Sequence, residues 1–330
     1  MGRGRLTALL VPLLLAGTTA VDAQEIATDS TRAEAIQDPD GPEIVVTGDR
    51  NRDRAVQRYV SAITVRTREQ IARFADAVCP ASFGLRARDN IRVADRVREV
   101  ARAAGIRVAS QNCRPNILIL IAENGEDVLA GLRRRRPGFF TGLGLTEIRH
   151  LAQADGPVHA WQVVEERGAD GRTTESIAFI RSPNGTLMYI GASRQLNTLV
   201  ASRLGRTVRQ DLALSVVIFD VDALDGLTLT QIGDYAAMRA LAPTDSDRAP
   251  SGRTILALFK DRHAGAAPAD ALTGLDSAYL RAVYGTDNRV GGWMQQANIV
   301  RAVDRELANA AGESEVSPIP TRVAANRSNR

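Results

Sequence analysis

Residues 227–241 read LTLTQIGDYAAMRAL, and this stretch decides the fold that we expect. Thr228 and Gln231 have the spacing of a capping box, in which each side chain bonds the backbone N–H of the other residue at the start of a helix. Apolar residues recur at helical spacing as far as Leu241, and Pro243 stops the pattern. The stretch therefore predicts a capped helix with a buried face.

A loop, a short apolar turn at residues 254–256 and a second helical stretch follow this helix. The second stretch, residues 272–285, reads LTGLDSAYLRAVYG. This order resembles the matrixin branch of the metzincin peptidases, in which the helix carries His-Glu-x-x-His-x-x-Gly-x-x-His and a methionine-containing turn and a Leu-Thr-x-x-Asp helix follow. The resemblance extends over most of residues 60–285. It implies an α+β fold of the zincin type, with a mixed sheet, an active-site-type helix and C-terminal helices.

The metal-binding positions of that family are replaced in this chain. The resemblance places Thr230 and Asp234 where the first two histidines belong, Gln231 where the glutamate belongs and Ala240 where the third histidine belongs. Leu256 takes the place of the methionine. A catalytic zinc needs three protein ligands, and the two on the helix must lie four residues apart. The resemblance therefore implies a zincin scaffold without zinc and without peptidase activity.

The histidine count leads to the same expectation without reference to any family. The chain has three histidines. His150 and His159 are separated by Gly156 and Pro157, which excludes one helical face, and His263 stands alone in a loop. The amide of Gln231 cannot act as a general base. We therefore expect no metal and no cofactor, and we favour a protein that is not an enzyme.

One enzymatic alternative depends on the carboxylates around the helix. Asp220 and Asp222 precede it, and Asp234 lies within it. Clustered carboxylates bind hard divalent cations, so an atypical metal-dependent hydrolase is the second hypothesis. Acidic residues at strand ends and turns are more often solvated, and this favours the non-catalytic interpretation.

Residues upstream of the helix predict the strands of the sheet. Residues 116–122 are apolar on both faces, which indicates a strand in the middle of a sheet. Residues 158–166 predict an edge strand, where a peptide can add as a further strand with Trp161 as a contact. Trp161 and Trp293 are both candidates for a binding surface, but because the chain has so few aromatic residues we favour a core position for both. Other predicted elements are a β-prone run at 61–66, helices at 68–77 and 89–104, and strands at 106–109 and 212–221.

Cys79 and Cys113 are the two cysteines of the chain, and we expect them to form a disulfide. The bond closes a loop of 34 residues, which corresponds to about 3–4 kcal/mol of stabilisation through the unfolded state. A catalytic dithiol is disfavoured because such pairs usually occur as Cys-x-x-Cys.

The N-terminal residues predict export. Residues 1–23 combine Arg3 and Arg5 with a short apolar run and a cleavage site after Ala23, as in a secretory signal peptide. We expect a flexible leader at 24–55, a zincin-like domain at 56–312 and a disordered tail at 313–330. The protein is then periplasmic or extracellular and does not span a membrane.

Charge and short motifs limit the expected partners. Removal of residues 1–23 lowers the formal charge from +4 to +3, which gives no concentrated basic face, so we expect no nucleic-acid partner. Six residues from Glu43 to Gly48 read EIVVTG and resemble the TonB-contacting segment of outer-membrane receptors. An envelope partner of TonB-linked transport is thus a third hypothesis. The first remains an exported structural module or a module that binds a protein or peptide.

Overall fold

The computed structural model describes residues 50–67, 69–154, 156–168, 171, 175–181, 187–194 and 206–315. For residues 50, 175–181, 187–194 and 312–315 it describes the backbone only. The predicted signal peptide and the segment from Glu43 to Gly48 lie outside these residues. Among the described helices, none is both long enough and apolar enough to cross a bilayer.

Helices and strands alternate in the first half of the body, and helices dominate the second half. The helices are α1 (Arg50–Ile63), α2 (Ala87–Ala103), α3 (Gly125–Arg135), α4 (Leu145–Gln153), α5 (Leu229–Leu241), α6 (Leu258–His263), α7 (Gly274–Gly285) and α8 (Gly292–Glu315), with short 3₁₀ turns η1 (Pro137–Phe140), η2 (Val221–Leu224) and η3 (Ile255–Ala257). The strands are β1 (Pro80–Phe83), β2 (Ile117–Ala122), β3 (Val158–Gly168), β4 (Glu175–Arg181), β5 (Leu187–Arg194) and β6 (Val208–Asp220).

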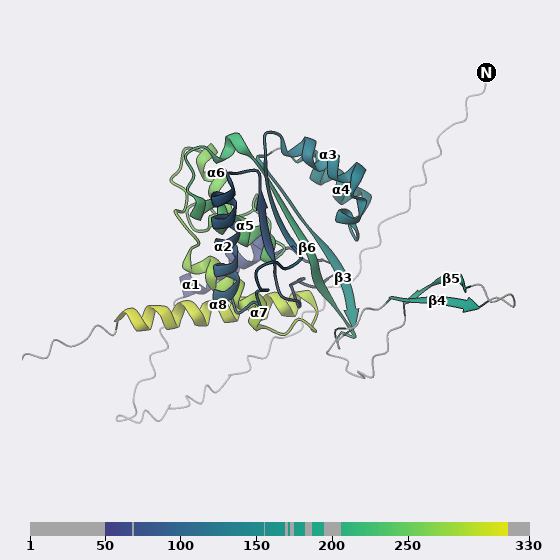
Figure 1. Cartoon of the computed structure of the whole chain (residues 1–330). Coiled ribbons are helices and arrows are strands. Elements are labelled where there is room, and N and C mark those ends of the chain that lie inside the picture. The colour runs from purple at the N-terminus through teal and green to yellow at the C-terminus, as the bar shows by residue number, and fades with distance from the viewer. Residues whose placement is uncertain are drawn as a thin grey trace, which may run out of the picture. The chain divides into compact units, whose positions relative to one another are not determined.

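A mixed sheet with the order β1-β2-β6-β3 forms the centre of the body. β1, β2 and β6 run parallel, and β3 pairs antiparallel with β6 at one edge (Figure 1). A parallel bridge between Val78 and Val108 brings the predicted strand at 106–109 beside the start of β1. Strands β4 and β5 form a separate antiparallel pair. The predicted α+β class with a mixed sheet is confirmed.

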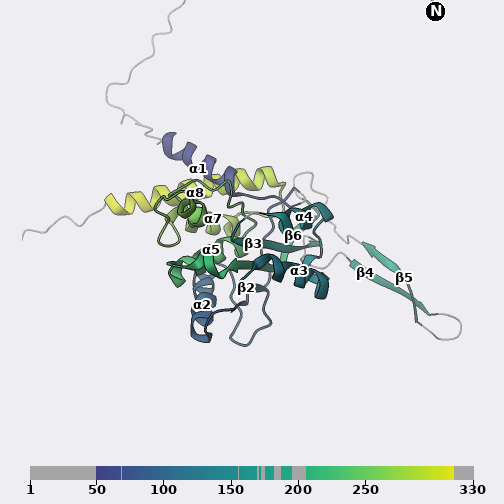
Figure 2. The same cartoon turned by 90° about the horizontal axis from the view of Figure 1, so that it is seen from above.

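Helices cover both faces of this sheet. One face packs against α2, α5 and α7 in the larger core, and the opposite face packs against α3, η1 and α4 (Figures 1 and 2). Ile117, Ile119 and Ile121 of β2 point into the larger core, whereas Leu118 and Leu120 point to the other side. The expectation that β2 lies in the middle of the sheet is confirmed.

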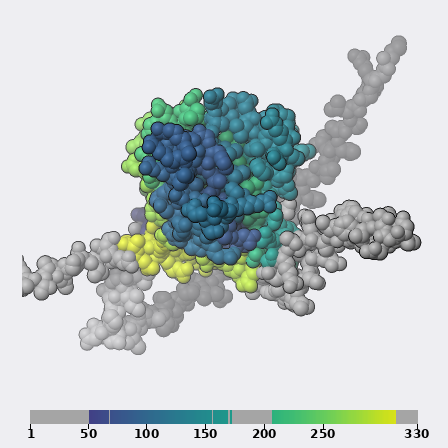
Figure 3. Space-filling view, in the orientation of Figure 1, coloured from purple at the N-terminus to yellow at the C-terminus, as the bar shows by residue number. Residues whose placement is uncertain are grey.

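The N-terminal part of the body differs from the sequence prediction. α1 begins at Arg50 and continues to Ile63, so the predicted β-prone run at 61–66 is wrong. Its buried residues, Val56, Tyr59, Val60 and Ile63, recur at helical spacing, and a short window starting at 61 misses this stripe. α1 packs against α8. In Figure 3 the dark blue residues at the front of the body belong to α2, and the yellow residues below them belong to α8.

The predicted helix at 68–77 is also wrong. The described residues of this segment form an irregular chain with isolated bridges, and side chains hold it in place instead of a helical ladder. Nη1 of Arg73 donates to the carbonyls of Val283, Tyr284 and Thr286 at 2.7–2.9 Å. These long-range bonds to the end of α7 are invisible in a local sequence pattern.

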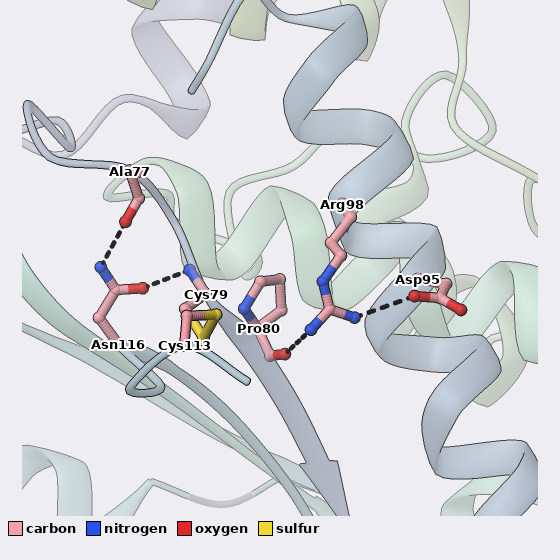
Figure 4. The surroundings of a disulfide bond; sticks show 7 residues. All are labelled: Ala77, Cys79, Pro80, Asp95, Arg98, Cys113 and Asn116. Atoms are coloured by element: carbon pink, nitrogen blue, oxygen red, sulfur yellow. Dashed lines mark hydrogen bonds and ion pairs between the residues drawn. A yellow bond between two sulfur atoms is a disulfide. The ribbon is translucent and has the colours of Figure 1, made fainter. Parts of the chain in front are cut away.

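The disulfide between Cys79 and Cys113 is confirmed, with a Cα–Cα distance of 6.1 Å. Asn116 reinforces it, because its side chain accepts from the Cys79 N–H at 2.7 Å and donates to the Ala77 carbonyl at 3.1 Å (Figure 4). The bond and this amide together fix the entries of β1 and β2 beside each other.

Candidate functional site

A groove of about 1100 Å³ lies along the free edge of the sheet. Its floor is β3 from Val158 to Val164. Residues of α4 and the loop at Gly142 form one wall. The other wall combines residues from the C-terminal half of α5, the loop at 243–247 and α6. We call this space the edge groove.

The backbone of β3 presents hydrogen-bonding groups to the edge groove. The Pro157 carbonyl accepts from the Asp220 N–H at 2.9 Å, which makes these residues a hydrogen-bonded pair of the β3–β6 ladder. Such pairs alternate along an antiparallel ladder, so the N–H and C=O groups of Val158, Ala160 and Gln162 point away from β6. Among the described strands none pairs with this side of β3.

The edge groove is closed at one end by the chain at Gly142. A Cβ atom built on Gly142 would lie 3.2 Å from the Val164 carbonyl oxygen, so this backbone passes directly beside the edge. Gly142 has a φ of 85°, a conformation that favours glycine. The free edge of β3 therefore ends near Gln162.

Tyr235 and Arg239 are the α5 residues that line the edge groove. They lie four apart and so share one face of the helix. Of the positions that the resemblance assigned to the metal site, Leu256 lines the groove, but Thr230, Gln231, Asp234 and Ala240 do not. The predicted alignment thus chose a different face of α5.

Asp234 is fully buried on the α2 side of α5 and has all its carboxylate oxygens in use. Nε of Arg96 donates to Oδ1 at 2.6 Å and Nη2 donates to Oδ2 at 3.1 Å, while the Leu272 N–H donates to Oδ2 at 2.7 Å. The ion pair raises the pKa of Arg96. Asp234 is therefore a structural link between α5, α2 and the start of α7.

Gln231 and Asp220 also have structural partners. Gln231 completes the predicted capping box with Thr228 and donates to the Ala269 carbonyl at 3.0 Å. Oδ1 of Asp220 accepts from the Gly125 N–H at the start of α3, at 2.7 Å. Asp222 is exposed. Across the described residues, no three His, Cys, Asp or Glu side chains gather as a metal site requires, so the carboxylates of the hydrolase hypothesis are not brought together.

The two tryptophans have opposite environments. Trp161 borders the edge groove, but its side chain is only 3% exposed, and its ring stacks on Phe140 with the centroids 5.0 Å apart. Its Nε1 donates to the Phe139 carbonyl at 2.7 Å. Trp161 thus anchors a core, as the favoured prediction held. Trp293 is exposed, so the core prediction is wrong for it.

All three histidines of the chain border the edge groove, although their positions in the sequence do not predict this grouping. His159 is buried, and its Nδ1 lies 3.3 Å from the Leu151 carbonyl. His150 and His263 are exposed on α4 and α6. The fold brings His150 and His263 to opposite walls of the groove and His159 to its floor, and they form no metal cluster among the described residues.

Sequence reasoning missed the cations of the edge groove. Arg239 extends from α5, and Lys260 and Arg262 extend from α6. One signal was available: Arg239 is the only charged residue between Asp234 and Asp245. A single arginine in the otherwise apolar C-terminal half of this buried helix indicates a specific role.

Tyr235 lies beside Arg239 and is almost fully buried. Burial raises the pKa of its hydroxyl, and the charge of Arg239 opposes this effect. The groove face of α5 therefore combines a neutral phenol with a guanidinium.

No protein-family model, no curated protein sequence and no solved structure matches this chain.

Proposed function

We propose that the protein is a non-catalytic binding module with a zincin-like scaffold that receives an extended segment of another protein along β3. The observation that carries this proposal is the free edge of β3 at the floor of the edge groove. A segment that adds there forms main-chain hydrogen bonds with the sheet, and the groove walls select its side chains.

The zincin-like scaffold is supported by the position of α5 relative to β3. The resemblance implies a cleft that runs along a sheet edge above the active-site-type helix. The edge groove lies along antiparallel β3 and is lined by α5. Tyr235 and Arg239 have the spacing that two zinc ligands on this helix would have.

The absence of catalysis is supported by the chemistry of those two positions. A guanidinium stays protonated in proteins and has no lone pair to give to a metal. Its positive charge also repels a cation. Glu147 lines the groove, but its Oε2 accepts from the Gly144 N–H at 2.6 Å, which occupies it at the start of α4.

Main-chain hydrogen bonds between β3 and an added segment would supply several kcal/mol of binding free energy. Val158, Ala160 and Gln162 offer three donors and three acceptors. At about 0.5–1.5 kcal/mol of net stabilisation per hydrogen bond, the edge contributes several kcal/mol before side chains add to it. Weak but specific peptide binding is the expected result.

The proposal is tested by selecting heptapeptides from a random displayed library on the purified full chain. We then expect a selected peptide to lose affinity on N-methylation at every second residue and to keep it at the residues between, because only alternate N–H groups face β3. A peptide with no such alternation would argue against strand addition. A library without any binder would argue against the binding function itself.

We also propose export through residues 1–23 to the periplasm or the extracellular space. The disulfide between Cys79 and Cys113 supports an oxidising compartment. Thiol trapping in cells should find these cysteines oxidised in the full chain and reduced after deletion of residues 2–23. Oxidised cysteines in the deletion variant would contradict this role of the segment.

A further inference from the structure

We infer that the segment received by the edge groove is acidic, with a carboxylate that pairs with Arg239. This inference rests on the proposed function, because it names the chemistry of the segment that adds to β3. Three groups of observations support it: the unmatched donors of Arg239, the pairing of the other groove cations, and the position of the groove's own carboxylates.

Arg239 is only partly matched within the protein. Nη1 donates to the Thr244 carbonyl. Its Nε is buried and has no hydrogen-bond partner among the described residues. A buried donor without a partner is unfavourable, and a carboxylate is the acceptor that fits a guanidinium best because it binds two N–H groups at once. Arg239 lines the edge groove and has no carboxylate within ion-pair distance among the described residues, so a carboxylate that enters the groove meets an unpaired positive charge.

Lys260 and Arg262 add positive charge to the same wall. Nζ of Lys260 donates to the Ala249 carbonyl at 2.5 Å, and Arg262 donates to the Ala223 and Asp225 carbonyls at 2.9 and 2.6 Å. These partners are neutral backbone groups. In the described part of the chain, neither cation lies within ion-pair distance of a carboxylate, so their charge attracts an acidic ligand.

Among the described residues that line the groove, the two carboxylates are outnumbered by the three cations. Glu147 is occupied at the start of α4, and Asp247 lies exposed in the loop after α5. Apolar groups such as Leu143 and Phe259 complete the walls. The matching ligand is an extended segment in which an acidic side chain is flanked by apolar ones.

A neutral or basic segment fits less well. A neutral segment leaves the guanidinium of Arg239 without a negatively charged partner. A basic segment brings like charges together in the groove, which opposes binding. The charge of the groove therefore selects among segments that the edge of β3 alone would accept equally.

The test uses a heptapeptide from the displayed library and its twin in which glutamate or aspartate is replaced by the corresponding amide. Binding of both is measured by fluorescence anisotropy to the full chain, to Arg239→Gln and to Arg248→Gln. Arg248 is an exposed arginine that does not line the groove, so it is the matched control. Melting temperatures verify that the variants are folded.

We expect the selected peptides to be enriched in Asp and Glu. We also expect Arg239→Gln to weaken the acidic peptide at least tenfold, to leave its amide twin nearly unchanged, and Arg248→Gln to change neither. Arg239→Lys should restore part of the affinity. Binders without acidic enrichment, or an equal loss for both peptides, would overturn the inference and leave strand addition intact. A library without binders would overturn both.

Discussion

The two sides of α5 treat their charged residues in opposite ways. On the α2 side, Asp234 is fully buried and accepts three hydrogen bonds, two from Arg96 and one from Leu272. On the groove side, Arg239 keeps a buried N–H without a described partner. The first arrangement links α5, α2 and the start of α7, whereas the second leaves a donor of the guanidinium unmatched. Burial alone therefore does not show the role of a charged residue in this helix, because the two residues differ in their partners.

Asp276 of α7 is a second buried carboxylate whose hydrogen bonds lie within the fold, and its removal should have the largest effect. Asp276 is fully buried and accepts from Tyr59, Thr254, the Ile255 N–H and Thr273. Asp276→Ala leaves these donors unmatched, and we expect a loss of about 4–5 kcal/mol in the free energy of unfolding, measured by urea titration. Asp270→Ala, at an exposed position, is the control. A loss below about 2 kcal/mol would contradict the structural role.

Asp234→Ala tests the matched side of α5 directly. The change leaves the Leu272 N–H and the partly exposed Arg96 without their acceptor. We expect a loss of about 3 kcal/mol in the free energy of unfolding. Asp222→Ala should change it by less than about 0.5 kcal/mol, since Asp222 is exposed. Equal effects of the two substitutions would remove the distinction between the two sides.

Alkaline pH should weaken the body through its buried tyrosines. Burial raises the pKa of Tyr279 to about 12, above its usual value of 10.0. The folded protein therefore holds this proton longer than the unfolded chain, and the associated stability is complete below about pH 10 and lost as pH rises to about 12. Two pKa units correspond to about 2–3 kcal/mol. Urea titrations between pH 8 and 12 measure the loss.

Tyr279→Phe removes the titrating group and is the matching variant. It also removes the contact of the hydroxyl with Thr64 at 3.2 Å, so its stability at pH 8 should fall by about 1 kcal/mol. Its decline from pH 10 to pH 12 should be shallower than that of the parent chain. An unchanged slope would assign the alkaline effect to other groups.

Arg239→Gln should have the smallest effect on stability. Its hydrogen bond to the Thr244 carbonyl is lost, but a buried unmatched donor is removed as well. We expect the free energy of unfolding to change by less than about 1 kcal/mol, similar to Arg248→Gln. A large destabilisation would show that Arg239 has a structural role, as Asp234 has, and would argue against the proposed binding role.

Local signals in the sequence predicted several elements well. The capping box of Thr228 and Gln231 predicted the start of α5, and the apolar run at 116–122 predicted a central strand. Two cysteines allow one pairing within the chain, so the disulfide required no three-dimensional information. Each of these predictions depends on neighbouring residues or on a simple count.

The groove face of α5 could not be predicted in the same way. Residues from Gln231 to Met238 are all buried, so this helix has no polar stripe that identifies its open side. The alignment to the metzincin motif therefore assigned the site to the face of α5 that carries Asp234. The cationic wall likewise depends on α6 meeting α5 across the loop at 243–247, and sequence spacing does not reveal that contact. Both the open face of α5 and the cationic wall therefore depend on tertiary packing, which a local sequence pattern does not reveal.

The closed end at Gly142 limits what the edge groove can accept. A strand rises about 3.4 Å per residue, so the free edge from Val158 to Gln162 spans about 17 Å. A longer segment meets the backbone beside Val164 and has to end or turn there. If a segment adds to β3 as we propose, the groove would discriminate by length and would favour a chain terminus or a tight turn next to the bound residues over the middle of a long extended chain.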